Sequence, residues 1–187
     1  MESKSNKALI VGLGNPGKKY EMTRHNFGKI ALSAFADKHH LFFKKERELE
    51  GEMSKGSVKE KQVFLLFPTT YMNLSGQAVK KTLNFYKIPE DHLLVLIDDA
   101  ALPFGALRYR AKGSSGGHNG LKDIEEKLGT QEYQRLKIGI GGPQVGALED
   151  YVLAPFTKEE QEKIPEITTQ VIKFIEEWLF QEMKEYA

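Results

Sequence analysis

The sequence predicts an α/β fold: one domain spanning residues 1–187, with a twisted, mixed and mostly parallel central sheet flanked by helices. Two observations lead to this prediction. Short apolar runs typical of buried strands alternate along the chain with segments of helical periodicity. The 187 residues suit a single domain, and no repeat, low-complexity tract or linker interrupts them.

The first half of the chain contains three expected elements. ALIVG, residues 8–12, is a short apolar run that ends in glycine, which is typical of a buried strand. From Phe27 onward, apolar side chains recur on one helical face as far as His39 and His40. KQVFLLFP, residues 61–68, is expected to be a strand stopped by its proline.

The next elements lie between residues 75 and 112. Ser75 is expected to cap a helix that ends near Pro89. HLLVLID, residues 92–98, is apolar throughout its middle, as a central strand covered on both faces would be. ALRYRAK, residues 106–112, alternates apolar and basic side chains and predicts a half-exposed strand.

The last third continues the alternation. GSSGG, residues 113–117, is expected to be a flexible loop. A helix over residues 121–129 should end at Gly129. RLKIGIG, residues 135–141, should form another strand, and a long amphipathic helix is expected from Ile167 to Met183.

Composition narrows the classes of function. The chain has 27 basic and 26 acidic residues and a net charge of +1, so any nucleic-acid-binding surface must be local. It has no cysteine, which excludes disulfides, thiolate metal ligands and a cysteine nucleophile. No segment has the roughly 20 apolar residues of a membrane span, and no secretory signal pattern is seen. We therefore expect a soluble, cytoplasmic protein without membrane contact.

Two glycine-rich motifs suggest alternative functions. Gly12, Gly14 and Gly17 match the G-x-G-x-x-G fingerprint of dinucleotide binding, but helical periodicity starts only near Phe27 and not directly after the loop. We therefore expect no nucleotide cofactor. GSSGG fits the G-x-S-x-G pattern of a serine hydrolase with Ser115 as nucleophile, but the chain lacks the histidine expected well downstream of it.

Polar side chains gather where the expected strands end or shortly after. The set comprises Asn15, Asn73, Asp98, His118 and Asn119. In open α/β sheets, ligands bind outside the carboxyl ends of the strands. The pattern therefore indicates one site built from several strand ends, although each asparagine alone is typical of a turn or a helix cap.

His25 and Asp98 are candidates for acid–base chemistry. An imidazole can take a proton from water near neutral pH, and a carboxylate on its other nitrogen fixes the tautomer and stabilises the imidazolium. Neutral amides suit a peptide-like substrate. His25, Asp98 and His118 could instead bind a metal, but no clustered ligand spacing such as H-E-x-x-H is present, so we expect no metal.

A basic stripe borders the same region. Arg108, Arg110 and Lys112 share one face of an expected strand beside the glycine loop, and Arg135 and Lys137 repeat the spacing on another strand. Such a stripe can be a solvated strand face or a set of phosphate contacts. Because the stripe lies next to the expected site, we give phosphate binding the same weight as a solvated strand face.

Five motifs in chain order resemble those of the bacterial-type peptidyl-tRNA hydrolases: GLGNPGKKYEMTRHNFG, TTYMNLSG, DDAALPFG, GSSGGHNGLKDI and RLKIGIGGP. The resemblance covers residues 7–156. It implies a monomeric α/β enzyme that hydrolyses the ester between a peptide and the 3′ end of tRNA, without metal or cofactor. The implied partner is peptidyl-tRNA, bound through its acceptor stem and 3′ end, and free tRNA would return to translation.

The resemblance also implies residue roles. His25 would be the catalytic base, Asp98 its carboxylate partner, and Asn15 the reader of the peptide part of the substrate. The substrate site would be lined by Tyr20, Tyr71, Met72, Asn73 and Asn119, and acceptor-stem phosphates would meet Arg108, Arg110 and Lys112. The chain departs from the family pattern at Ala100 and Ala101, where a leucine and an acidic residue are common. A serine esterase using Ser115 and a non-catalytic RNA-binding module remain the alternatives.

Overall fold

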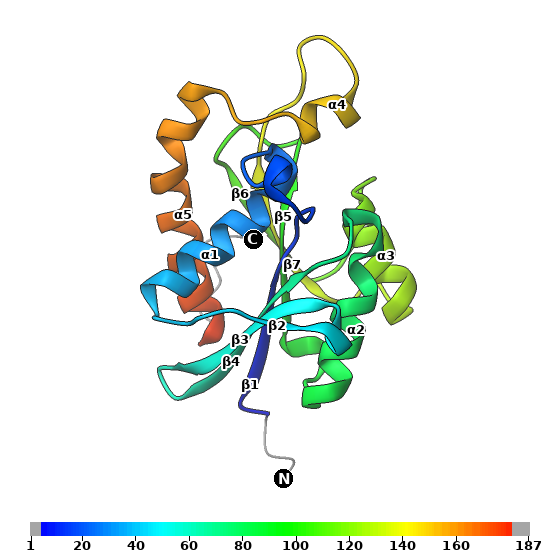
Figure 1. Ribbon diagram of the computed structural model, residues 1–187, viewed down its shortest axis with the longest axis vertical. Helices are drawn as coiled ribbons and strands as arrows, with labels where there is room; N and C mark the ends of the chain where they lie inside the picture. The colour runs from blue at the N-terminus through cyan, green and yellow to red at the C-terminus, as the bar shows by residue number, and fades with distance from the viewer. Residues whose placement is uncertain (1–4, 181–187) are drawn as a thin grey trace.

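The computed structural model describes residues 5–180, and these contain a seven-stranded sheet with helices on both faces (Figure 1). The strands are β1 (Lys7–Gly12), β2 (Lys44–Glu46), β3 (Gly51–Val58), β4 (Lys61–Pro68), β5 (Leu93–Asp99), β6 (Leu107–Arg110) and β7 (Gln134–Gly139). The α-helices are α1 (Phe27–Lys38), α2 (Ser75–Tyr86), α3 (Asn119–Leu128), α4 (Leu148–Leu153) and α5 (Lys158–Leu179). Three short 3-10 turns matter for the site: η1 (Lys18–Tyr20), η2 (Arg24–Asn26) and η4 (Met72–Leu74).

The sheet is parallel at its centre and antiparallel at its edges. Its strand order is β2-β3-β4-β1-β5-β7-β6. The four central strands, β4, β1, β5 and β7, pair in parallel, whereas β2, β3 and β6 join through antiparallel pairs. The predicted α/β fold with a mixed, mostly parallel sheet is therefore confirmed, with the parallel part confined to the centre. A single domain over all of residues 1–187 stays a prediction, because both ends lie outside the described residues.

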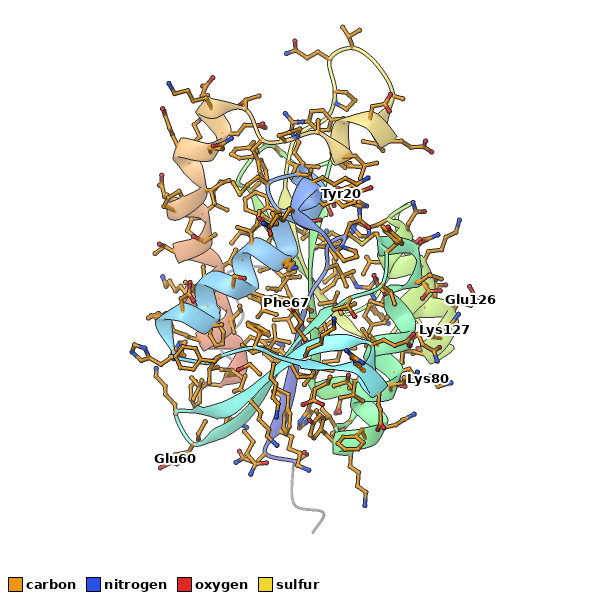
Figure 2. All side chains as sticks on the ribbon, in the orientation of Figure 1. Tyr20, Glu60, Phe67, Lys80, Glu126 and Lys127 are labelled. Carbon is orange, nitrogen blue, oxygen red and sulfur yellow. The ribbon has the colours of Figure 1, made fainter. Side chains whose placement is uncertain are left out.

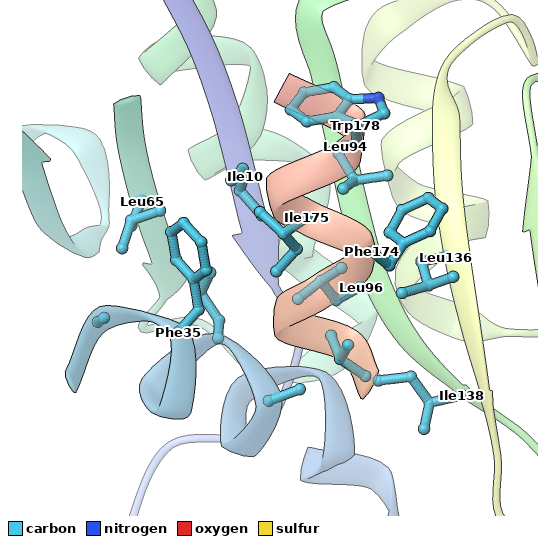
Figure 3. Close-up of a cluster of buried hydrophobic side chains, with 14 of the residues drawn as sticks. Ile10, Phe35, Leu65, Leu94, Leu96, Leu136, Ile138, Phe174, Ile175 and Trp178 are labelled. Carbon is cyan, nitrogen blue, oxygen red and sulfur yellow. The ribbon is translucent and has the colours of Figure 1, made fainter. Parts of the chain in front are cut away.

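Two separate apolar layers hold the helices to the sheet. α1 and α5 cover one face, where Phe35, Phe174 and Trp178 pack against strand residues such as Ile10 and Leu96 (Figure 3). α2 and α3 cover the other face, over a second cluster that includes the alternate residues of β1 and β5. Strands covered on both faces need apolar side chains in both directions, which explains the unbroken apolar runs in the sequence.

The two antiparallel strands at one edge of the sheet, β2 and β3, were not predicted. β2 and β3 lie in a segment rich in lysine, glutamate, glycine and serine, without a clear alternation of apolar residues. The pairing of β3 with β4 along its whole length supplies the order that the local sequence lacks, and β2 adds to β3. β6, in contrast, alternates as predicted, with Leu107 and Tyr109 half-buried and Arg108 and Arg110 exposed.

The predicted cap of α2 and the predicted start of α5 were wrong. Ser75 does not cap α2: its hydroxyl donates to the carbonyl of Met72 at 2.7 Å, and the buried carboxylate of Asp123 in α3 accepts from the amide of Gly76 at 2.7 Å. The cap of α2 is thus supplied by another helix.

The C-terminal helix α5 begins at Lys158, nine residues before the predicted start at Ile167. A capping box between Thr157 and Glu160 fixes this start. The helix also continues through Pro165, where burial of Ile164 and Ile167 on one face opposes the cost of about 3 kcal/mol of an interior proline. The predicted end at Met183 lies outside the described residues. No helix in residues 5–180 has the length and apolar character needed to cross a membrane.

Candidate active site

The polar residues predicted at the strand ends meet at one end of the sheet. Asn15 lies in the loop after β1, Asp98 is the penultimate residue of β5, and His118 directly precedes α3. His25 belongs to η2, the single turn that leads into α1. Figure 2 labels Tyr20, which lies near the end of the molecule that carries α4.

Asp98 is the centre of the site. Its side chain is buried, and both carboxylate oxygens lie 2.9 Å from Nδ1 of His25. Its Oδ1 also lies 2.9 Å from Nε2 of His118. The two imidazole rings have their centroids 5.0 Å apart. The structure therefore joins His25 and Asp98 as the sequence suggested and adds His118 as a second partner of the same carboxylate.

The hydrogen bonds fix the tautomer of each histidine. An ionised carboxylate only accepts, so His25 donates from Nδ1 and His118 donates from Nε2. The Nδ1 of His118 accepts from the amides of Gly120 and Leu121 at 3.1 and 3.4 Å and so caps α3. Both nitrogens of His118 are occupied. Of the two rings, only His25 keeps a nitrogen, Nε2, with a lone pair available to take a proton.

The charge of Asp98 is maintained by its two partners. Burial by itself would raise the pKa of this carboxyl, but its electrostatic interactions and hydrogen bonds with His118 and His25 outweigh burial and lower the pKa to about 2. Asp98 is therefore ionised near neutral pH. It can hold the His25 ring and stabilise its protonated form.

The lowered pKa of Asp98 predicts an acid-sensitive contribution to stability. Because the folded-state pKa lies below the usual 3.8, the contribution is present above that value and is lost as the pH falls through about 2. It should amount to about 2 kcal/mol of unfolding free energy. Denaturant unfolding of the wild type and Asp98→Asn from pH 5 to pH 2 measures it. If the difference in unfolding free energy between the two proteins does not shrink from pH 5 to pH 2, the lowered pKa of Asp98 is contradicted.

Asn15 is held in one orientation by its neighbours. Its Oδ1 accepts from the amide of Met72 at 2.7 Å. Asn26 bonds both backbone groups of Asn15: its Oδ1 accepts from the Asn15 amide at 2.8 Å, and its Nδ2 donates to the carbonyl at 3.0 Å. A Cβ on Gly14 would lie 2.8 Å from the Asn26 side chain, so the loop needs glycine at that position. Within residues 5–180, the Nδ2 of Asn15 donates to no protein group, which leaves it for a ligand.

The other predicted substrate residues lie around this centre on separate turns. Tyr71, Met72 and Asn73 belong to the η4 region, where Tyr71 and Asn73 are exposed and Met72 is buried. Asn119 is the exposed first residue of α3, and Tyr20 is half-buried at the end of η1. Within the described part of the chain, none of them hydrogen-bonds to His25 or Asp98.

The basic stripe is only partly as predicted. Arg108, Arg110 and Lys112 are exposed on and after the edge strand β6. Arg135 is not on the surface: it is 1% exposed, and its guanidinium donates to the carbonyls of Gly113, Gln131 and Tyr133. The alternation along β7 predicted an exposed Arg135. Its side chain instead lies under the GSSGG loop and donates to a backbone carbonyl there. Arg135 therefore supports the loop and offers nothing to a phosphate.

A metal at the three-residue cluster would require rearrangement. One ligand atom from each of His25, Asp98 and His118 lies within 4.8 Å of the other two. The nitrogen–oxygen separations of 2.9 Å are those of hydrogen bonds. A tetrahedral zinc ion with ligands at about 2.0–2.2 Å holds them about 3.3–3.6 Å apart. The cluster as it stands fits a hydrogen-bonded relay better than a metal centre.

The serine-esterase alternative has no support from the geometry. His118 is the only histidine near Ser115 in sequence, and both of its ring nitrogens are already engaged. No hydrogen bond within residues 5–180 joins the Ser115 hydroxyl to an imidazole. Ser115 instead supplies its backbone carbonyl to the His118 amide at 3.0 Å.

The fold is that of an α/β protein, and at its site a buried carboxylate hydrogen-bonds to two imidazoles, an arrangement suited to general-base chemistry. Comparison with known proteins gives the family. Residues 9–187 match the family model for peptidyl-tRNA hydrolase. The chain belongs to the peptidyl-tRNA hydrolase family.

Individual relatives agree with this assignment. A peptidyl-tRNA hydrolase of Clostridium perfringens is 44% identical over 177 residues, covering 95% of this chain and 93% of the relative. One from Carboxydothermus hydrogenoformans is 49% identical over 154 residues, 82% of each chain. The crystal structure of the enzyme from Acinetobacter baumannii superimposes with a TM-score of 0.89 at 34% identity, covering 97% of this chain and 92% of that one.

Proposed function

We propose that this protein hydrolyses the ester bond between a peptide and the 3′ end of tRNA, with water activated by Nε2 of His25. The observation that carries the proposal is the arrangement around Asp98. The carboxylate accepts hydrogen bonds from the proton-bearing nitrogens of both histidines. Of these two rings, only that of His25 retains a nitrogen free to act as a base. Asp98 would stabilise the imidazolium formed when water is deprotonated. No metal or cofactor is needed for this step.

The direct test uses N-acetyl-aminoacyl-tRNA, a minimal blocked substrate. Release of free tRNA is expected, at the same rate with and without a chelator. Absence of release by the wild-type protein would reject the hydrolase proposal and favour a non-catalytic RNA-binding role. Action as a cytoplasmic monomer is part of the same proposal, and sedimentation with and without tRNA would test the monomer.

Arg108, Arg110 and Lys112 are proposed to bind acceptor-stem phosphates. Arg110→Ala is expected to raise KM for full-length substrate and leave kcat almost unchanged, because the guanidinium contributes to binding and not to chemistry. Each lost phosphate contact should reduce the magnitude of the salt slope of log K by about 0.7 to 0.9. Lys80→Ala removes an equal charge from the exposed face of α2 and serves as control. An unchanged slope in Arg110→Ala would show that the stripe is only a solvated strand face.

Asn15 is proposed to distinguish peptidyl-tRNA from aminoacyl-tRNA. Both carry the same ester and RNA, but only the blocked substrate has an amide carbonyl next to the α-nitrogen. Because Oδ1 of Asn15 is bound to Met72, the group left for substrate is the Nδ2 donor. This donor matches a carbonyl oxygen and opposes an ammonium group, and an unpaired buried charge is costly.

Asn15→Asp is therefore expected to erode selectivity. The carboxylate can still accept from the Met72 amide, and its second oxygen can pair with the free amine. The ratio of kcat/KM for N-acetyl-aminoacyl-tRNA to that for aminoacyl-tRNA should fall about tenfold or more, since a site built on polar matching discriminates strongly. Asn15→Ala is the matched control, because it removes the donor without adding a charge. A ratio unchanged in Asn15→Asp would remove Asn15 from the discrimination.

A further inference from the structure

Arg24, the residue before His25, is a buried arginine whose partners come from α4 and α5. It is only 6% exposed. Its Nη2 donates to Oε1 of Glu160 at 2.8 Å, and its Nε lies 3.4 Å from Oε2. Its Nη1 donates to the carbonyl of Tyr151 at 3.1 Å, and the guanidinium lies 4.0 Å from the centre of the Tyr151 ring. A guanidinium held by a carboxylate on its edge and a ring on its face has one orientation.

The backbone around Arg24 also bonds to the segment that joins α4 and α5. The Arg24 amide donates to the carbonyl of Ala154 at 3.1 Å, and the Phe156 amide donates to the carbonyl of Met22 at 3.0 Å. Thr23 and Pro155 form an antiparallel bridge. The segment that enters η2 is therefore paired with the link between α4 and α5, which lies at the same end of the molecule (Figure 1).

The three residues of η2 send their side chains to three different parts of the protein. Arg24 binds Glu160 and Tyr151, His25 binds Asp98 of β5, and Asn26 binds the backbone of Asn15 after β1. A single 3-10 turn has little stability of its own. Its orientation, and with it the direction of the His25 Nε2 lone pair, depends on these three attachments.

Glu160 links the turn to the start of α5. One oxygen, Oε1, accepts both from Nη2 of Arg24 and from the Thr157 amide, each at 2.8 Å. Thr157 in return accepts from the Glu160 amide at 3.1 Å, completing the capping box. The same carboxylate therefore caps α5 and holds the arginine beside the proposed base.

We propose that Arg24 is a positioning residue for His25, coupling the orientation of the η2 turn to the junction of α4 and α5. The inference rests on the proposed function. Arg24 is buried and its side-chain bonds go to Glu160 and Tyr151, so it acts through His25 and does not touch substrate. Its loss should misalign the base and lower kcat while leaving KM almost unchanged.

The test compares steady-state kinetics of Arg24→Lys and Glu160→Gln with the wild type on N-acetyl-aminoacyl-tRNA. Lysine keeps the charge but loses the fork and the ring contact. Glutamine keeps the oxygen that caps α5, but it loses the charge and places an amide donor where Oε2 faced Nε of Arg24. Each is expected to lower kcat about tenfold or more with KM within twofold, since small displacements of a reacting group have effects of this size. Both changes break the same attachment, the Arg24–Glu160 pair. The double variant should therefore be no slower than the slower of the two single variants.

Thr157→Ala is the structural control, because it removes the reciprocal cap of α5 and leaves the Arg24–Glu160 pair. It should lower the melting temperature but keep kcat within twofold of the wild type. All rates are taken well below the lowest melting temperature, with His25→Ala in the same assay. An active wild type with kcat unchanged in Arg24→Lys and Glu160→Gln, or with additive losses in the double variant, would overturn the inference. An inactive wild type would instead reject the proposed function.

Discussion

His25→Ala is expected to lower kcat by about 10²–10⁴-fold, the usual contribution of general acid–base catalysis. The physical reason is that Nε2 of His25 is the lone basic nitrogen left by the hydrogen bonds around Asp98. Binding of tRNA should stay within a few-fold of the wild type, because the imidazole acts in the chemical step and not on the phosphates. Single-turnover kinetics together with a tRNA binding titration would separate the two effects.

Ser115→Ala is the matched control for the His25 variant. It removes a polar group from the loop beside His118 but not from the proposed mechanism, so turnover should be retained and phosphonylating reagents should not inhibit. Near-normal kcat in His25→Ala would exclude His25 as the base. Loss of activity in Ser115→Ala with covalent labelling of the serine would restore the esterase alternative.

Asp98→Asn is expected to be more harmful than Asp98→Ala, although asparagine has nearly the same shape as aspartate. His118 must donate from Nε2, since its Nδ1 is committed to the start of α3. It would therefore hold the single acceptor oxygen of the introduced side-chain amide at the Oδ1 position and leave the amide nitrogen at the Oδ2 position, which lies 2.9 Å from Nδ1 of His25. A donor facing Nδ1 of His25 places the ring proton on Nε2, which can then no longer act as a base.

The expected losses are about 10⁴-fold in kcat for Asp98→Asn, as for other catalytic histidines held in the wrong tautomer, and a smaller loss for Asp98→Ala. Combining Asp98→Asn with His118→Ala should recover part of the activity, because the amide is then free to turn its oxygen toward His25. Equal kcat in the wild type and Asp98→Ala would remove Asp98 from the mechanism. A double variant no faster than Asp98→Asn alone would contradict the tautomer argument.

The central fold could be predicted from sequence because its signals are local. The apolar runs of β1, β4 and β5 and the periodicity of α1 follow directly from burial on one or both faces. β2 and β3 carry no such signal, since pairing that extends from β4 orders them. The cap of α2 and the start of α5 were missed: a carboxylate from α3 caps the first helix, and a capping box before Pro165 begins the second.

The site was predictable in its residue types but not in its connections. Strand-end position and acid–base chemistry suggested His25 and Asp98, which are separated by 73 positions in the chain, and the resemblance to a known family gave the same pair. Nothing local indicated that Arg135 would turn inward, that Arg24 would be buried, or that His118 would share Asp98. A histidine just before a helix is a possible cap in the sequence, but its second nitrogen reaches Asp98 only because α3 packs beside β5 through the second apolar cluster.

The double engagement of His118 has a consequence for observing the enzyme without substrate. The amides of Gly120 and Leu121 are tied through one imidazole ring to the carboxylate of Asp98. When that carboxylate is neutralised or replaced, the ring loses the partner that orients it, and the two amides lose their acceptor. Their protons then exchange with solvent more readily and their resonances shift. The first turn of α3 is thus a spectroscopic reporter of the charge at the centre of the site, readable in the resting protein.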